Sequence, residues 1–180
     1  MLYNRLIFLV YSKQDILNAT HQANYIDCRI NAYPCYIEYR GINRQAPNII
    51  FIDIDRNGFE SDAKHRQALY DTLDNISKEF GMQEPTVLWS GNGYHVILHI
   101  DMPILEQIDK YGRFTNPSEK FLRYAEHALS NCKADSCHVP SFKSCLLRIP
   151  GSLNSKCVKA GKDAQVRIIQ RWNGKLGTPN

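Results

Sequence analysis

Apolar and polar positions alternate in several short segments of the chain, and this pattern predicts β-strands. The segments are rich in β-branched and aromatic residues, which suit the pleated, half-buried surface of a sheet. The apolar segment at 6–11 is too short for a signal sequence and is better explained as a buried strand. The strands are expected at 6–11, 35–39, 48–55, 86–90, 94–101 and 165–172.

Two longer segments have apolar residues at helical spacing. Between 61 and 80 the apolar positions repeat on one face, and Gly81 follows as a C-terminal stop. The second helix is expected to follow Asn116, where Pro117 takes the first helical position and Glu119 completes a capping pattern. Strands, helices and at least one hairpin together predict an α+β fold.

The composition is that of a globular protein, with 43% hydrophobic and 22% charged residues. No repeat or flexible linker interrupts the sequence, so residues 1–180 are expected to form a single domain. No apolar stretch approaches the roughly 20 residues that a membrane span needs. We therefore expect an intracellular protein without a membrane partner.

The net charge is only +4, but the basic residues are unevenly distributed. Between Arg148 and Lys175 there are seven Lys and Arg residues and a single acid, Asp163. A basic C-terminal third beside an acidic cluster elsewhere favours a polyanionic substrate. A solvated basic surface is the alternative.

The sharpest chemical signal is the pair Asp53 and Asp55 at the end of a predicted strand. Because side chains alternate along a strand, both carboxylates are expected on one face, with Cα atoms about 7 Å apart. Like charges so placed repel unless a cation lies between them, and oxygen ligands suit Mg²⁺ or Mn²⁺. The alternative is a strand that simply runs out into solvent.

An Asn-Gly turn joins two of the predicted strands. Its glycines, Gly91 and Gly93, would let a phosphate approach the backbone amides closely. His95 would project beside this turn, where its ring could donate a hydrogen bond to a phosphate oxygen. A plain hairpin is the alternative.

A third segment near the C-terminus gathers donors for phosphate. Arg148 and Lys156 flank a Pro-Gly turn that contains Ser152 and Asn154. Arginine supplies a bidentate fork and lysine a point charge, and the hydroxyl and amide groups add further donors. The segment predicts a phosphate-binding loop, with a solvated loop as the alternative.

In this order the three segments resemble the motifs of the archaeo-eukaryotic primase superfamily, in particular its small primase-polymerases from archaea and mobile elements. Asp53-Ile-Asp55 matches the acidic strand, and Gly93-Tyr-His95 matches the motif of a small residue, any residue and His. Arg148-Ile-Pro-Gly-Ser-Leu-Asn-Ser-Lys156 matches the Arg-X-Pro-Gly-Ser/Thr-X-Asn-X-Lys stretch. The resemblance covers about residues 48–172.

The resemblance implies an RRM-like catalytic core, with a central, mostly antiparallel sheet flanked by helices. It implies a DNA primase or template-directed polymerase, a nucleotidyltransferase that makes or extends primers by two-metal phosphoryl transfer. The expected partners are a single-stranded DNA template, a primer, NTPs or dNTPs, and other replication or primase subunits. The expected location is the cytoplasm, in association with the nucleoid.

The resemblance also assigns roles to individual residues. Asp53 and Asp55 would hold Mg²⁺ or Mn²⁺, and His95 would contact the phosphates of the incoming nucleotide. Arg148 and Lys156 would neutralise the triphosphate. Supporting contacts are expected from Ser90, Ser152 and Asn154, beside Gly91 and Gly93. The family's third acid is expected at Asp135, with Asp101 as the rival, and sequence spacing does not decide between them.

A cluster of sulfur and imidazole ligands could hold zinc, as inserted modules do in some primase relatives. The spacing is irregular and lacks a Cys-X₂-Cys pair, and Cys145 equally suits a core position before two leucines. The candidate ligands are Cys132, Cys137, His138, Cys145 and Cys157.

Two other classes of function remain open. One is a non-catalytic, nucleic-acid-binding subunit of a primase complex, which the retained cluster of like charges disfavours. The other is a metal-dependent nuclease or a replication initiator with a similar acidic strand. The basic turn, which suits a triphosphate, weighs against it.

Overall fold

The computed structural model describes residues 9–33, 35–38, 41–44, 48–81, 83–100, 117–140 and 145–177, which form an α+β fold as the pattern predicted. The helices are α1 (Lys13–Gln22), α2 (Asp62–Phe80), α4 (Pro117–Leu129) and α5 (Ser155–Lys159), and a short 3-10 helix, η1 (Arg56–Gly58), follows β4 directly. The strands are β1 (Arg29–Asn31), β2 (Cys35–Glu38), β3 (Gly41–Arg44), β4 (Ile49–Asp55), β5 (Thr86–Trp89), β6 (Gly93–His99), β7 (Leu146–Arg148) and β8 (Arg167–Gln170).

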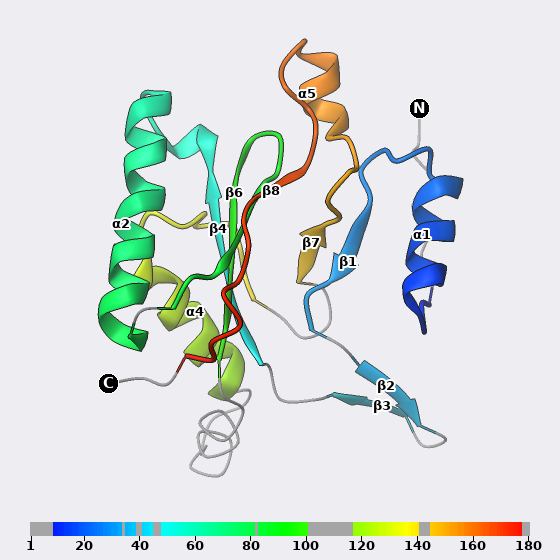
Figure 1. The fold of residues 1–180 in the computed structure, drawn as a ribbon, viewed down its shortest axis with the longest axis horizontal. Coiled ribbons are helices and arrows are strands. Elements are labelled where there is room, and N and C mark those ends of the chain that lie inside the picture. Colours follow the sequence, from blue (N-terminus) through cyan, green and yellow to red (C-terminus); the bar gives the residue numbers. More distant parts are fainter. Residues whose placement is uncertain are drawn as a thin grey trace.

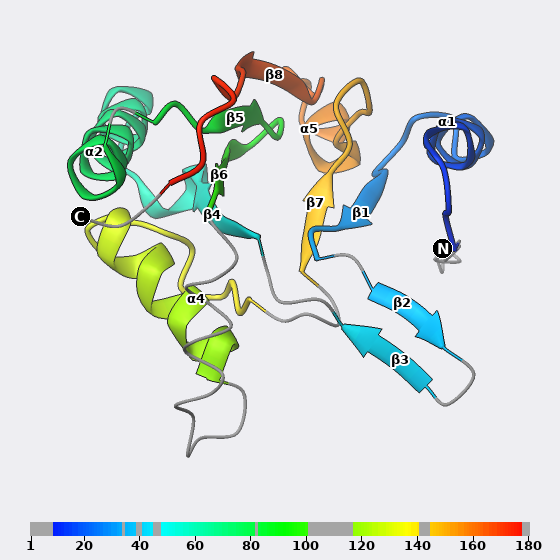
Figure 2. The same cartoon turned by 60° about the horizontal axis from the view of Figure 1, so that its bottom comes forward.

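The main sheet contains four antiparallel strands in the order β4-β6-β5-β8. Two smaller antiparallel sheets pair β1 with β7 and β2 with β3. Figures 1 and 2 show α2 and α4 on one side of the main sheet and the β1–β7 pair on the other. The candidate chemistry lies on the side of the β1–β7 pair.

The core fixes which way the side chains of β4 point. Ile50, Ile52 and Ile54 are fully buried, and each such side chain contributes about 1.5–3 kcal/mol relative to exposure. Because the side-chain period of a strand is two, a slip of one residue would move all three isoleucines to the opposite face of the sheet. The same alternation sends Asp53 and Asp55 to the opposite face.

Both predicted helices are present. Ser61 begins α2, accepting a hydrogen bond from the Lys64 backbone N–H, and Gly81, with φ of 64°, ends it. α4 begins at Pro117, as expected from its first-turn proline, whereas Asn116 lies outside the described residues.

Some elements differ from the sequence-based expectation. Residues 9–11 lead into α1 without forming a strand, so the prediction for 6–11 is wrong in its described part. Helices α1 and α5 and the short strands β1, β3 and β7 were not predicted. None of the described helices is long and apolar enough to cross a membrane.

Candidate active site: a cleft between an acidic and a basic wall

A cleft of about 600 Å³ separates the main sheet from the β1–β7 pair and α5. This volume is within the range of ordinary ligand sites. We call the titratable residues lining it from the main sheet the acidic wall, and the cations lining it from the other side the basic wall. The acidic wall comprises Asp53, Asp55 and His95, and the basic wall comprises Arg29, Arg148, Lys156 and Lys162.

β4 is an end strand of the main sheet, so the backbone groups of Asp53 that point away from β6 bind to residues outside the sheet. The Asp53 N–H donates to Oε1 of Glu126 (3.0 Å), and its carbonyl accepts from the N–H of Asp135 (2.7 Å). Asp53 is paired with His95 in the register of β4 and β6. Since the polar groups of Asp53 point away from β6, the two form a non-hydrogen-bonded pair, the kind with the closest side chains. Nε2 of His95 lies 3.8 Å from Oδ1 of Asp53.

Ionisation of the Asp53 carboxyl group is unfavourable in the protein without a bound cation. Burial raises the pKa of Asp53 to about 7, and the charges of Asp55, Asp135 and Glu126 act in the same direction, although His138 opposes them. A cation nearby would stabilise the charged form.

Asp55 is oriented by the glycine turn and by η1. Its Oδ1 accepts hydrogen bonds from the Asn57 backbone N–H (3.0 Å) and from Nδ2 of Asn92 (2.8 Å). Neighbouring groups therefore hold both aspartates in place. For Asp53 they bind the backbone, and for Asp55 they bind the carboxylate.

The glycines of the turn are required by close packing. A Cβ atom on Gly93 would lie 2.6 Å from the Ile54 carbonyl oxygen, and one on Gly91 would lie 2.9 Å from Cβ of Asn154. Nδ2 of Asn154 donates to the carbonyl of Ser90 (3.1 Å), and the Ser90 hydroxyl donates to the carbonyl of Gly93 (3.0 Å). These contacts connect the turn on the acidic side with the segment that carries the basic wall.

His95 is almost completely buried and neutral. Its ring packs edge-on against Phe51, with centroids 5.1 Å apart. Burial, together with the positive charges of Arg148, His138 and Arg29, lowers the pKa of His95 to about 3. Its Nδ1 is buried and has no hydrogen-bond partner among the described residues. Nε2, on the side of Asp53, is thus the ring atom available to a ligand in the cleft.

The basic wall brings two arginines together. Arg29 and Arg148 are directly opposite in the β1–β7 pair, an arrangement of like charges that destabilises a sheet. Nη1 of Arg148 lies 3.0 Å from Oδ1 of Asp27. Burial tends to raise the pKa of Asp27, but hydrogen bonds from Ser155 and Arg148 outweigh it and hold this pKa below its ordinary value. Asp27 thus offsets repulsion at Arg148, and an anion in the cleft would interact favourably with both arginines.

Some of the other residues predicted to contact phosphate line the cleft, and others do not. Lys156 is exposed on α5, and its N–H is capped by Oδ1 of Asn154 (3.2 Å). Ser90, Gly93 and Asn154 line the cleft together with it. Ser152 does not line the cleft, because it is fully buried and its hydroxyl donates to the Ile149 carbonyl (2.7 Å). Gly91 is not among the residues that line the cleft either.

Of the two candidates for the third acid, Asp135 lies next to Asp53 through the main-chain hydrogen bond given above. Its Oδ1 accepts from the Cys137 N–H (2.9 Å), and its side chain is not among those lining the cleft. Asp101 lies outside the described residues.

The five candidate zinc ligands are not brought together as a set, although His138 and Cys145 are neighbours. The Cys157 thiol donates to the Gly91 carbonyl (3.1 Å), whereas Cys132 is exposed at the end of α4. His138 lies between Oε1 of Glu126 (2.7 Å) and Sγ of Cys145 (3.5 Å). Within the described ranges no three His, Cys, Asp or Glu side chains are arranged to hold a metal ion, and this includes the aspartates near the cleft.

Sequence reasoning missed the residues that support the two walls, Asp27 and Glu126. Glu126 is fully buried, and its Oε2 has no partner among the described residues. Burial disfavours the charged form of His138, but Cys145 and Glu126 outweigh it and raise the pKa of His138 to about 10. One signal was available: Glu126 follows Leu122 by four positions and precedes Leu129 by three, so a carboxylate lies on the apolar face of a helix.

We compared the chain with known proteins and found no relative. No family model, no curated protein and no solved structure matches the chain.

Proposed function

We propose that this protein is a divalent-cation-dependent nucleotidyltransferase of the primase–polymerase type, which adds nucleotides to a primer on a single-stranded DNA template. The proposal rests on one observation above all: two aspartates and a cluster of Arg and Lys side chains face the same cleft of about 600 Å³ from opposite sides. In a metal–triphosphate complex, the cation would complement the acidic wall and the phosphates would complement the basic wall.

The basic wall suits the triphosphate. Arg29 and Arg148 would each gain a charge-assisted hydrogen bond from a phosphate placed between them, and such bonds are about twice as strong as neutral ones. Lys156 would add a mobile point charge at the mouth of the cleft. The neutral ring of His95 would donate from Nε2 to a phosphate oxygen near Asp53.

The acidic wall suits a hard cation. Asp53 and Asp55 offer oxygen donors, the type that Mg²⁺ and Mn²⁺ prefer. The raised pKa of Asp53 fits the same ligand, because a cation would remove the cost of its charged form. Of two such cations, one would lower the pKa of the attacking 3′-hydroxyl and the other would stabilise the charge on the leaving pyrophosphate.

The chain's own residues would contribute mainly positioning. Glu126 and Asp135 hold the backbone of Asp53, and Asn92 holds the carboxylate of Asp55, so little reorganisation is needed when substrate binds. The sheet β4-β6-β5-β8 with α2 and α4 would be the RRM-like core of the enzyme. Its expected setting is a replication or primase assembly in the cytoplasm, at the nucleoid.

Primer extension tests the proposal directly. The protein is incubated with Mn²⁺, a primer annealed to a longer single-stranded template, and labelled NTPs or dNTPs. We expect extension by the unmodified protein and none by Asp55→Asn. Asp71→Asn, a change at an exposed aspartate on α2, is the matched control and should extend normally. Template binding without extension would indicate the non-catalytic alternative, and degradation would indicate a nuclease; either result contradicts the proposal.

A further inference from the structure

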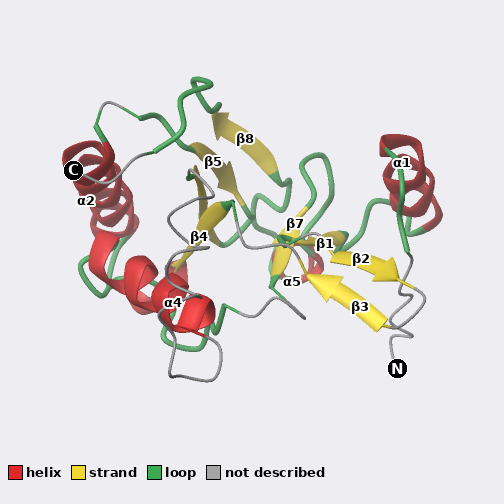
Figure 3. Ribbon diagram, turned by 90° about the horizontal axis from the view of Figure 1, so that it is seen from below, coloured by secondary structure: helices red, strands yellow, loops and turns green. Residues whose placement is uncertain are grey.

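The main sheet ends in β8. Just before this strand, Val166 already exchanges backbone hydrogen bonds with Gly151 and Ser152, so within the described residues the outer edge is open along β8 itself. β8 is last in the order β4-β6-β5-β8 and, within the described residues, pairs only with β5. Figure 3 shows β8 at the outer end of the sheet, beside β5. An edge strand leaves a row of N–H and C=O groups to which another strand can bind, and proteins usually cover or disrupt such edges.

A second hollow, of about 220 Å³, adjoins this edge between β8 and α2. Its lining is mostly apolar and includes Leu69, Leu73 and Ile169. Ile169 is 47% exposed and Tyr70, at the same hollow, is 56% exposed. Apolar and aromatic side chains so exposed beside an open strand mark a surface that a partner can cover.

The hollow is on the face of the sheet opposite the cleft. Tyr94 lines the hollow and His95 lines the cleft, and consecutive residues of a strand point to opposite faces. A partner at this edge would therefore leave the cleft open to its own ligands.

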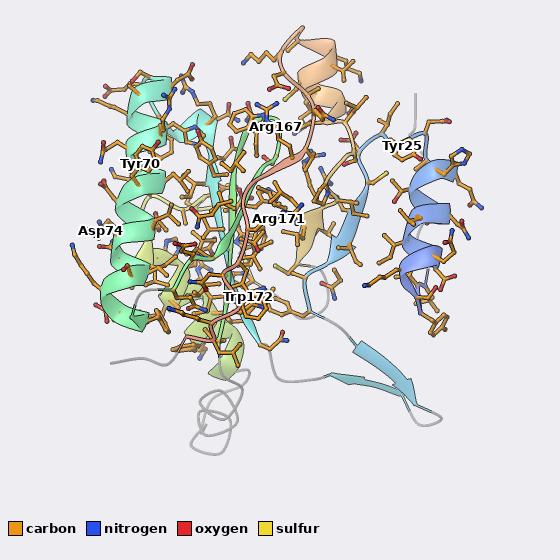
Figure 4. All side chains as sticks on the ribbon, viewed as in Figure 1. Tyr25, Tyr70, Asp74, Arg167, Arg171 and Trp172 are labelled. Atoms are coloured by element: carbon orange, nitrogen blue, oxygen red, sulfur yellow. The ribbon has the colours of Figure 1, made fainter. Side chains whose placement is uncertain are left out.

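The charged residues around the edge of β8 are mostly arginines, which indicates an acidic partner. Arg66 is the charged residue among those lining the hollow, and Arg167 and Arg171 lie at the two ends of β8 (Figure 4). Arg167 is half-exposed and pairs with Asp163 (2.6 Å). A second copy of this chain pairing edge to edge would place Arg167 and Arg171 against one another. An acidic strand would meet them with opposite charge.

We propose that β8 and the adjoining hollow bind an extended, acidic segment of a partner protein by strand addition, with one apolar side chain of that segment in the hollow. Main-chain hydrogen bonds to the edge would provide affinity, and the hollow and the arginines would provide specificity. The proposal does not depend on the activity proposed for the cleft.

A labelled model peptide tests this. The probe is a capped peptide of about eight residues, the length of an ordinary strand, that alternates Asp or Glu with Val or Leu. Fluorescence anisotropy with the full chain should give a Kd on the order of 10 µM. Ile169→Asp and Arg171→Glu should each weaken binding at least tenfold, to roughly 100 µM or more. Leu17→Asp, a change at an exposed leucine on α1, is the matched control and should bind normally.

Three further measurements decide between occupants. A peptide with the same side chains but methylated on alternate backbone amides should lose binding, because it cannot pair with the edge. Retained binding of that peptide, or no binding of the parent peptide at millimolar concentration, would overturn strand addition. Displacement of the peptide by a single-stranded oligonucleotide would identify nucleic acid as the occupant. Dimerisation that Ile169→Asp abolishes would identify a second copy, and both outcomes would also overturn the proposal.

Discussion

The two walls of the cleft are built in different ways. The acidic wall lies on β4 and β6, long strands of the main sheet whose buried isoleucines fix the side-chain direction. The basic wall lies on β1, β7 and α5, elements of three to five residues, and on the segment after α5 that carries Lys162. There, the ion pair of Arg148 with Asp27 connects segments far apart in the sequence. One wall is fixed by core packing, and the other by the pairing of two short strands, by backbone hydrogen bonds and by this ion pair.

This difference shows where a ligand would stabilise the molecule. On each wall like charges lie close together, which costs free energy in the absence of a ligand. Packing in the sheet offsets that cost on the acidic wall, and the ion pair of Arg148 with Asp27 contributes on the basic wall. A ligand that carries a cation and an anion would relieve both, and the four predictions that follow separate these contributions.

The largest effect should come from Asp53→Asn. Removing this carboxylate should lower the rate of nucleotide incorporation by about 10³-fold, the upper range for the loss of one preorganised charged contact. Binding of triphosphate in the absence of metal should change little, because the basic wall is intact. Single-turnover kinetics and a nucleotide titration measure the two properties. Equal loss of both would show that the walls do not act separately.

Glu126→Gln should have the next largest effect, on stability. The change leaves protonated His138 without its buried counter-charge, and breaking such a pair costs about 3 kcal/mol. Urea unfolding measures the free energy. Glu79→Gln, at an exposed position of α2, is the control and should change it by less than about 0.5 kcal/mol. A loss equally small for Glu126→Gln would mean that this pair does not support the acidic wall.

A smaller effect is expected from the basic wall. Lys156 is exposed, so Lys156→Ala should leave the unfolding free energy unchanged and raise the KM for nucleotide about tenfold. Steady-state kinetics measures this, with Lys64→Ala on α2 as the control. A fall in kcat at unchanged KM would place Lys156 in a different role.

The smallest effect is a gain in stability. In metal-free protein, Asp53→Asn should stabilise the fold by about 1 kcal/mol at pH 8, as substitutions in strained active sites commonly do. The folded-state pKa of Asp53, about 7, lies above its ordinary value of 3.8, so its charged form costs stability as pH rises through this interval. The gain should therefore fade toward pH 4. Thermal unfolding at both pH values measures it, and a gain that is constant with pH would contradict the assignment.

The acidic wall could largely be predicted from the sequence, because it depends on local patterns. Alternation in 48–55 gave the side-chain direction of Asp53 and Asp55, and the Asn-Gly turn gave the β5–β6 hairpin that carries His95. The pairing of β4 with β6, which brings His95 beside Asp53, joins strands that are separated in the chain by α2 and β5, and local pattern does not predict it.

The supports of both walls could not be predicted in this way. β1 and β7 have three residues each, too few for a recognisable period, and their residues Arg29 and Arg148 are far apart in the sequence. Asp27 precedes β1 in a segment without apolar periodicity. Contacts of this kind depend on the assembled fold, and only the position of Glu126 on an apolar helix face indicated one of them in advance.

The most direct test of the account is a crystal structure of the protein with Mn²⁺ and a nucleoside triphosphate, with Mn²⁺ located by its anomalous scattering. The account predicts Mn²⁺ between the carboxylates of Asp53 and Asp55 and a phosphate oxygen, with the remaining phosphates against Arg148 and Lys156. Mn²⁺ at another place, or a triphosphate bound away from the basic wall, would contradict it.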